Sequence, residues 1–133
     1  MRGMQRNEER EQARLIKWTH KVAVRAVLPQ LRWLHHSPNG GKRDAITGGQ
    51  MKALGTKPGF PDLILPVRSG EQIGLVIEMK SATGSTTTEQ KEWLANFAAQ
   101  GWSTAVCRSA ADAREALLDY FGVSHDGAPP LEA

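Results

Sequence analysis

The sequence has little cysteine and no long apolar run. Cys107 is the single cysteine among 133 residues, which excludes an internal disulfide and favours a reducing compartment. No stretch reaches the roughly 18 consecutive apolar residues typical of a membrane-spanning helix. The polar start, MRGMQRNEEREQ, lacks the apolar stretch of a signal peptide. We therefore expect a cytoplasmic protein with no membrane partner.

The hydrophobic fraction of 40% and the charged fraction of 23% are ordinary for a globular chain. The length suits one compact domain, because domains cluster at roughly 100–150 residues. We place this domain over residues 1–123. Residues 124–133 (SHDGAPPLEA) have little to bury, and we expect them to form a flexible tail.

Positive and negative charge are unevenly distributed along the chain. Residues 1–60 carry 12 Lys and Arg against 4 Asp and Glu, whereas residues 61–133 carry 5 against 10. A basic half joined to an acidic half indicates a surface suited to a polyanion such as nucleic acid, although a solvated basic helix would give the same count.

Hydrophobic periodicity and turn residues predict the order α-β-(α)-β-β-α-β-α, an α/β fold with a mixed sheet flanked by helices. The expected elements are a helix over residues 8–28 stopped by Pro29, a strand over 31–35, a short helix over 46–54, strands over 62–65 and 73–80, a helix from a Thr86–Glu89 capping box to Gln100, a buried strand over 103–107, and a helix that Ser109 and Asp112 cap and Gly122 ends.

The two central strands predict a hairpin that brings three charged residues together. If its turn is centred on Gly70, Asp62 lies opposite Glu78. Glu78 and Lys80 are two residues apart, so they share one face of their strand. Directly opposed carboxylates repel each other, and burial adds a desolvation penalty.

A divalent cation between the two carboxylates would remove this repulsion, since Mg²⁺ prefers oxygen ligands. Two carboxylates, a metal ion and a lysine suit phosphodiester hydrolysis. The alternative is a surface pair of Glu78 and Lys80 with Asp62 as an ordinary turn residue. The neighbours His35 and His36 point opposite ways on a strand, and no Cys/His cluster indicates zinc.

The pattern PD, fifteen residues, then ExK at residues 61–80 resembles the PD-(D/E)xK nuclease signature. The text around it resembles the VRR-NUC family, which includes stand-alone phage proteins and the nuclease domain of the larger Fanconi-associated nuclease. The matching segments are HSPNGG at 36–41, KALG at 52–55, PGFPD at 58–62, QKEW at 90–93 and VCRS at 106–109.

The resemblance implies a restriction-endonuclease-like core and a catalytic centre. Asp62, Glu78 and the carbonyl of Met79 would hold Mg²⁺ or Mn²⁺, and Lys80 would orient the attacking water. Gln90 would join the site from the following helix, with a solvated helix residue as the alternative.

The resemblance also implies a first-helix Glu followed four residues later by a Gln. Glu8 and Gln12 fit this spacing, with Glu9 and Glu11 as competitors. The family is named for a Val-Arg-Arg signature, whereas this chain has Val-Cys-Arg at residues 106–108. The role of Arg108 therefore stays open between a phosphate contact and a cap on the sheet edge.

For DNA contacts we expect the turn residues Asn39, Gly40, Lys42 and Arg43, although Asn-Gly is also a common plain turn. Arg14 and Lys21 should line the same side as Asp62. Phe60 is the aromatic candidate for the DNA side, whereas Trp18, Trp33, Trp93 and Trp102 suit core or interface packing.

The resemblance implies an endonuclease that cuts branched or junction DNA as a homodimer, in a bacterial host if it is phage-encoded. Alternatives are a non-catalytic nucleic-acid-binding module with the same fold, and a scaffold protein whose basic helix docks on an acidic partner.

Overall fold

The computed structural model of the chain describes residues 2–38 and 45–132, with side chains from residue 7 and, after the gap, from residue 48. The elements along the described chain are α1 (Arg2–Thr19), α2 (Val22–Val27), the 3-10 helix η1 (Pro29–Trp33), β1 (His35–His36), α3 (Ala45–Ala53), β2 (Leu63–Leu65), β3 (Leu75–Met79), α4 (Thr88–Ala99), β4 (Ser103–Cys107), α5 (Ala110–Tyr120) and the 3-10 helix η2 (His125–Gly127).

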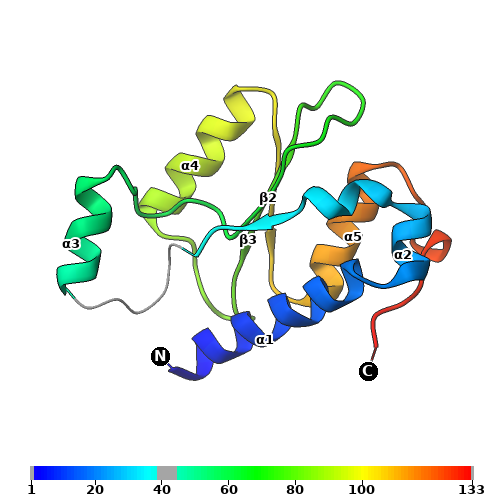
Figure 1. Cartoon of the computed structure of the whole chain (residues 1–133), viewed down its shortest axis with the longest axis horizontal. Coiled ribbons are helices and arrows are strands. Elements are labelled where there is room, and N and C mark those ends of the chain that lie inside the picture. Colours follow the sequence, from blue (N-terminus) through cyan, green and yellow to red (C-terminus); the bar gives the residue numbers. More distant parts are fainter. Residues whose placement is uncertain (1, 39–44, 133) are drawn as a thin grey trace.

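The described strands form one mixed sheet in the order β1-β2-β3-β4. β1 and β2 are antiparallel, β2 and β3 are antiparallel, and β3 and β4 are parallel. The parallel pair is joined by α4, as the long crossover between parallel strands requires. Figure 1 shows α4 on one side of the strands, α5 with α1 on the other, and α3 projecting from the body. The predicted α/β fold with a mixed sheet and flanking helices is confirmed.

Burial follows this layering. All five residues of β3 are buried, as expected for a central strand covered on both faces. Leu75, Ile77 and Met79 join the main core together with Trp18 and Leu117. By alternation, Val76 and Glu78 point to the other face, so a carboxylate lies in an otherwise apolar strand.

The predicted hairpin register is confirmed. Leu63 pairs with Ile77 and Leu65 with Leu75, which is the register that places Asp62 opposite Glu78. The turn itself differs slightly, because Ser69 pairs with Gln72 and Gly70 takes a φ of 58° at the tip. The pairing in the turn is shifted by one residue from the pairing of β2 with β3, but this shift is confined to the turn and leaves Asp62 opposite Glu78.

The prediction of a single helix over residues 8–28 is wrong. The chain leaves helical geometry at Lys21, whose φ and ψ are −64° and 138°. Arg25 donates a hydrogen bond to the carbonyl of Thr19, one of the carbonyls that the end of α1 leaves without a helical partner. This break turns α2 so that Val24 and Leu28 reach the core.

The prediction of a strand over residues 31–35 is also wrong. Pro29 stands at the start of η1, where its fixed φ suits a helical turn, and the turn buries Leu31. Only His35 and His36 pair as a strand, with both side chains exposed. The strand β4 is confirmed in extent but is half-exposed rather than buried, because it is the edge of the described sheet.

The helix after β3 begins one residue later than predicted. Thr87 rather than Thr86 is the N-cap, and Gln90 rather than Glu89 completes the capping box. The N-cap of α5 is the predicted one, since the Ser109 hydroxyl accepts from the Asp112 N–H.

The expectation that residues 124–133 have little to bury is wrong for the described part of that segment. Ala128 and Leu131 pack on the core. The carbonyl of Pro129 accepts hydrogen bonds from Trp18 Nε1 at 2.7 Å and from Arg114 Nε at 3.1 Å. Residues 125–132 therefore pack against α1 and α5, because a buried indole and a guanidinium need acceptors that the helices do not supply.

Candidate active site

A cleft of about 860 Å³ lies beyond the carboxyl end of β3, between α1 and the start of α4. It collects the residues that the sequence singled out for catalysis and metal binding. The lining residues are Glu8, Gln12, Asp62, Glu78, Met79, Lys80 and Gln90, together with Glu9, Ala13, Ile16, Lys17, His36 and Pro38.

Asp62 is fixed against the backbone of the neighbouring strand. Its Oδ2 accepts a hydrogen bond of 2.7 Å from the N–H of Met79. The carbonyl of Asp62 accepts from the N–H of Ser37 at 2.9 Å and lies 2.9 Å from His36 Nδ1. Both polar ends of the residue therefore have partners, which holds the carboxylate at the mouth of the cleft.

The PGFPD segment that leads to Asp62 is anchored on α4. Trp93 Nε1 donates to the carbonyl of Pro58 at 3.0 Å. Gly59 has a φ of 86°, and a Cβ there would lie 2.7 Å from the carbonyl carbon of Glu89. A side chain at this position is thus excluded both by backbone conformation and by space. Glycine lets the loop approach α4 closely enough to place Asp62 in the cleft.

Glu78 is the most perturbed acid of the site. It is 3% exposed, and its Oε2 accepts from Gln90 Nε2 at 3.1 Å. Burial raises the pKa of Glu78 to about 9, and the negative charge of Asp62 adds to the increase. Lys80 acts in the opposite direction and Glu8 in the same direction, which places all four groups within electrostatic range.

The second carboxylate oxygen of Glu78 is unusual for a buried polar atom. Oε1 is buried and has no hydrogen-bond partner among the described residues. An orphaned carboxylate oxygen beside a second carboxylate is costly without a positive ligand. No cluster of three or more His, Cys, Asp or Glu that could hold a metal occurs in the described ranges. The ligand set that the resemblance implies is Asp62, Glu78 and the Met79 carbonyl. Such an all-oxygen set fits Mg²⁺ or Mn²⁺ and does not suit zinc.

Gln90 links the start of α4 to this acid. Its Oε1 accepts from the N–H of Thr87 at 2.8 Å as part of the capping box, while its Nε2 donates to Glu78. One amide thus fixes the helix terminus and orients the carboxylate. The alternative of a solvated helix residue is excluded by these two contacts.

If Glu78 holds a metal ion in a nuclease centre, as the resemblance implies, replacing Gln90 with Ala should reduce DNA cleavage by about 10- to 100-fold, the usual loss when a residue that orients a metal ligand is removed. It should also lower the free energy of unfolding by about 1 kcal/mol through the lost capping box. Single-turnover cleavage and urea denaturation measure the two effects. Thr87→Ala, which removes only the cap, is the matched control and should lose stability with less loss of activity. Equal activity losses in both variants would contradict the orienting role.

The structure separates the three candidate acids of the first helix. Glu8 Oε1 accepts from the N–H of Ser81 at 3.0 Å and lines the cleft. Glu9 also lines the cleft, whereas Glu11 accepts from the N–H of Ala110 at the start of α5. That hydrogen bond is the largest cause of the lowered pKa of Glu11, and the hydrogen bond and charge of Arg14 lower the pKa further. Glu11 is therefore a cap of α5, and Glu8 is the acid held closest to the end of β3.

No sequence pattern indicated Ser81. This residue is 4% exposed, and its N–H donates a hydrogen bond to Glu8 Oε1. Its carbonyl accepts from Arg108 Nη1 at 2.8 Å, and Arg108 also donates to the carbonyl of Gly84. Arg108 thus holds the loop that follows Lys80. Its position after Cys107 gave no hint of this long-range contact.

Two predicted DNA contacts lie elsewhere. Arg14 and Lys21 do not line the cleft, so the expectation that they share the side of Asp62 is wrong. Arg14 is paired with Glu11 at 3.1 Å and Lys21 with Glu132 at 2.9 Å. Arg14 lies on α1 and Lys21 just beyond it, and both contact Glu132 in the 125–132 segment. Asn39, Gly40, Lys42 and Arg43 lie outside the described residues.

Four aromatic side chains form a cluster at α4. Phe60 packs edge-on against Trp93 at 4.9 Å and Phe97 at 5.7 Å, and Phe97 meets Trp102 at 5.0 Å between ring centres. Trp18 is buried as expected, but Trp33 is 57% exposed, with the guanidinium of Arg32 over its ring. Phe60 therefore serves packing of the loop on α4.

Comparison with known proteins identifies the family. The VRR-NUC domain model matches residues 6–111. The chain belongs to the VRR-NUC family. A solved structure titled "VRR_NUC domain protein" is 27% identical, covers 95% of this chain and 98% of its own, and has a TM-score of 0.71. No curated protein matches the chain.

VRR-NUC is a nuclease family of the PD-(D/E)xK type, so membership implies a nuclease-type hydrolase with DNA as its substrate. The aspartate of the PD pattern and all three residues of the ExK pattern line the cleft. No described helix is both long and apolar enough to span a bilayer.

Proposed function

We propose that this VRR-NUC protein is a metal-dependent endonuclease that hydrolyses phosphodiester bonds in branched DNA. The observation that carries the proposal is the buried, unpartnered Oε1 of Glu78 next to Asp62. Asp62, Glu78 and the Met79 carbonyl would hold Mg²⁺ or Mn²⁺. Such an ion would neutralise the two carboxylates and polarise the phosphate that is attacked.

The protein groups around the pair suit in-line attack by water. Lys80 lines the same cleft as both carboxylates, and its ammonium group can donate hydrogen bonds to a phosphate oxygen or to the attacking water. Gln90 keeps Glu78 from rotating, and Glu8 adds a carboxylate that can accept a proton from water. Water adds to phosphorus, one P–O ester bond breaks, and a phosphate monoester and a hydroxyl end result.

The proposal includes two further features, a preference for branched DNA and a homodimeric assembly. Both follow from the likeness to stand-alone VRR-NUC nucleases, because a four-way junction offers two symmetric strands to two active sites. Two large apolar side chains on adjacent elements, Val22 at 87% and Trp33 at 57% exposure, supply surface that a second copy can cover.

Labelled four-way junction, flap and linear duplex test the proposal in one experiment, with Mg²⁺, Mn²⁺ or EDTA. We expect cutting only with a divalent ion, faster on branched DNA, and a dimer mass by sedimentation velocity. Cutting in EDTA would refute the metal requirement. Equal rates on all three substrates would refute structure selectivity, and a monomer that cuts both strands of a junction would refute the dimer.

A further inference from the structure

A second cavity, of about 400 Å³, lies between α1 and the end of the described chain. We call it the α1 groove. It is distinct from the cleft, and it is rich in cationic side chains. The basic residues that line it are Arg10, Arg14, Lys17 and Lys21.

These four cations form a stripe that runs along α1 and continues just beyond its end. Steps of four and three residues keep Arg10, Arg14 and Lys17 on one face of α1, and Lys21, which lies after the helix, lines the same cavity. Their charge is only partly balanced. Arg14 pairs with Glu11 and Lys21 with Glu132, whereas Arg10 and Lys17 form no salt bridge in the part of the chain that the structure describes. The groove is therefore net positive.

Glu132 contacts the cations of the groove with both its carboxylate and its backbone carbonyl oxygen. Lys21 Nζ lies 2.9 Å from Glu132 Oε1, and Arg14 Nη2 donates at 3.0 Å to the carbonyl of Glu132. The Glu132 side chain is 63% exposed, so the pair is held at the surface rather than buried. Its pKa is lowered first by the hydrogen bond from Lys21, then by the charges of Lys21 and Lys17. Such exposed pairs contribute little stability and are readily exchanged.

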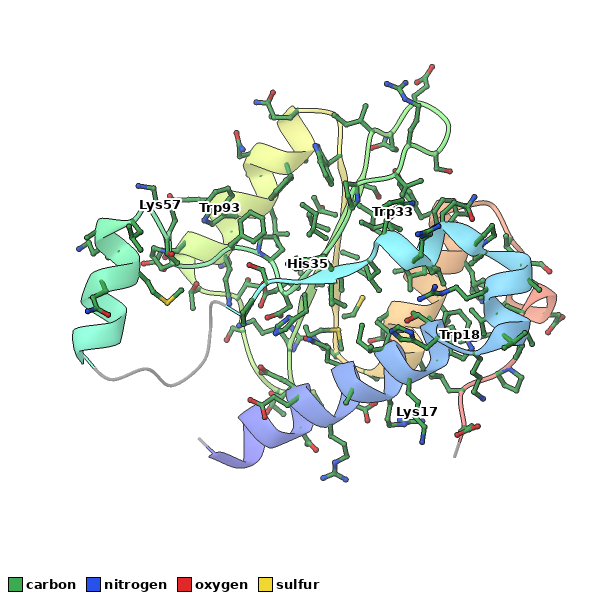
Figure 2. The ribbon with its side chains drawn as sticks, in the orientation of Figure 1. Lys17, Trp18, Trp33, His35, Lys57 and Trp93 are labelled. Atoms are coloured by element: carbon green, nitrogen blue, oxygen red, sulfur yellow. The ribbon has the colours of Figure 1, made fainter. Side chains whose placement is uncertain are left out.

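Lys17 connects the α1 groove to the active-site cleft. It lines both cavities, whereas Gln12 and Ile16 line only the cleft and Arg14 and Lys21 only the groove. Figure 2 shows Lys17 extending from α1 away from the sheet, toward the C-terminal end of the chain. A nucleic-acid strand that leaves the cleft over α1 would thus meet Lys17 first and then the rest of the stripe.

We propose that the α1 groove binds the sugar-phosphate backbone of the DNA strand that leaves the cleft, and that the Glu132 carboxylate occupies a phosphate position until DNA displaces it. The DNA identity of the ligand rests on the proposed function. Lysine and arginine fix phosphates without reading sequence, which suits a nuclease that recognises DNA shape. Glu132 then acts as an internal competitor that weakens binding of short or poorly fitting DNA.

The test measures binding of labelled branched DNA by fluorescence anisotropy in EDTA, where no cleavage intervenes. Glu132→Gln should tighten binding by about threefold or more in low salt, because Lys21 gains a phosphate contact. The slope of log K against log salt should steepen by about 0.9, the value for one additional phosphate contact. Glu71→Gln, on the exposed turn between β2 and β3, is the control with the same charge change.

The double variant Arg10→Ala, Lys17→Ala should weaken binding by about tenfold or more and flatten the salt slope. Arg68→Ala, on the same distant turn, should have a smaller effect. Thermal unfolding of each variant shows whether the fold is retained.

The proposal is overturned if Glu132→Gln binds like Glu71→Gln, or if it only lowers thermal stability, since Glu132 would then be a structural clamp. Failure of the nuclease proposal looks different. A wild-type protein that cuts no DNA with Mg²⁺ but shows these binding changes would keep the groove and lose the catalytic centre.

Discussion

Replacing Asp62 with Asn should reduce DNA cleavage by about 10³-fold or more, with little change in DNA binding measured in EDTA. The amide keeps the shape of the side chain, but it removes one of two carboxylates that would hold a cation, and no described residue offers a third within the same cluster. Its oxygen can still accept from the Met79 N–H, so the loop should stay in place.

Three measurements separate the causes of such a loss. Single-turnover cleavage reports the chemical step, calorimetric titration with Mg²⁺ reports metal affinity, and thermal unfolding reports the fold. Asp126→Asn, an exposed position in η2, is the matched control and should cut like the wild type. If Asp62→Asn cuts within tenfold of the wild type, a different group holds the ion and the assignment of the centre is wrong.

The part of the site that the sequence predicted is the part determined by short-range geometry. A turn near Gly70 and the two-residue period of a strand were enough to place Asp62 opposite Glu78, and the pairs Leu63–Ile77 and Leu65–Leu75 confirm it. The place of Gln90 in the site was implied by the family resemblance, and the structure shows its amide bonded to Glu78 from the first turn of α4.

What the sequence did not predict depends on contacts between distant segments. The periodicity of residues 8–28 continues through Lys21, and only the bond from Arg25 to Thr19 and the burial of Val24 show why the helix breaks. Arg14 and Lys21 carry charge that suits DNA, but nothing near them in sequence indicates that Glu132 reaches them. Likewise Glu8, Glu9 and Glu11 are equivalent in composition, and packing of α1 against α5 separates them.

Replacing Glu78 with Gln should abolish metal-dependent cleavage and, in the metal-free protein, raise stability at alkaline pH. Burial raises the pKa of Glu78 in the folded protein to about 9, from its ordinary value of 4.5. Between these values the unfolded chain has released a proton that the folded chain keeps, so the free energy of unfolding falls as pH rises and levels off above about 9. A glutamine at this position has no ionisable proton, so the variant does not lose this part of its stability as pH rises.

The expected gain at pH 8 is on the order of 2 kcal/mol, less than the full linkage value because local relaxation and water entry reduce the penalty. This corresponds to roughly 5–10 °C in melting temperature for a domain of this size. Near pH 5 the wild type and the variant should melt together, because little of the penalty has yet developed.

The measurement is thermal unfolding in EDTA from pH 5 to pH 9, with Glu71→Gln as the control for loss of one exposed carboxylate. Added Mg²⁺ should stabilise the wild type, since an ion that binds only the folded state shifts the equilibrium toward it, and should leave Glu78→Gln nearly unchanged. If the two proteins instead keep a constant difference in stability across the pH range, the carboxyl of Glu78 is not the group that links folding to pH. The cation would then not be needed to offset a buried negative charge at the end of β3.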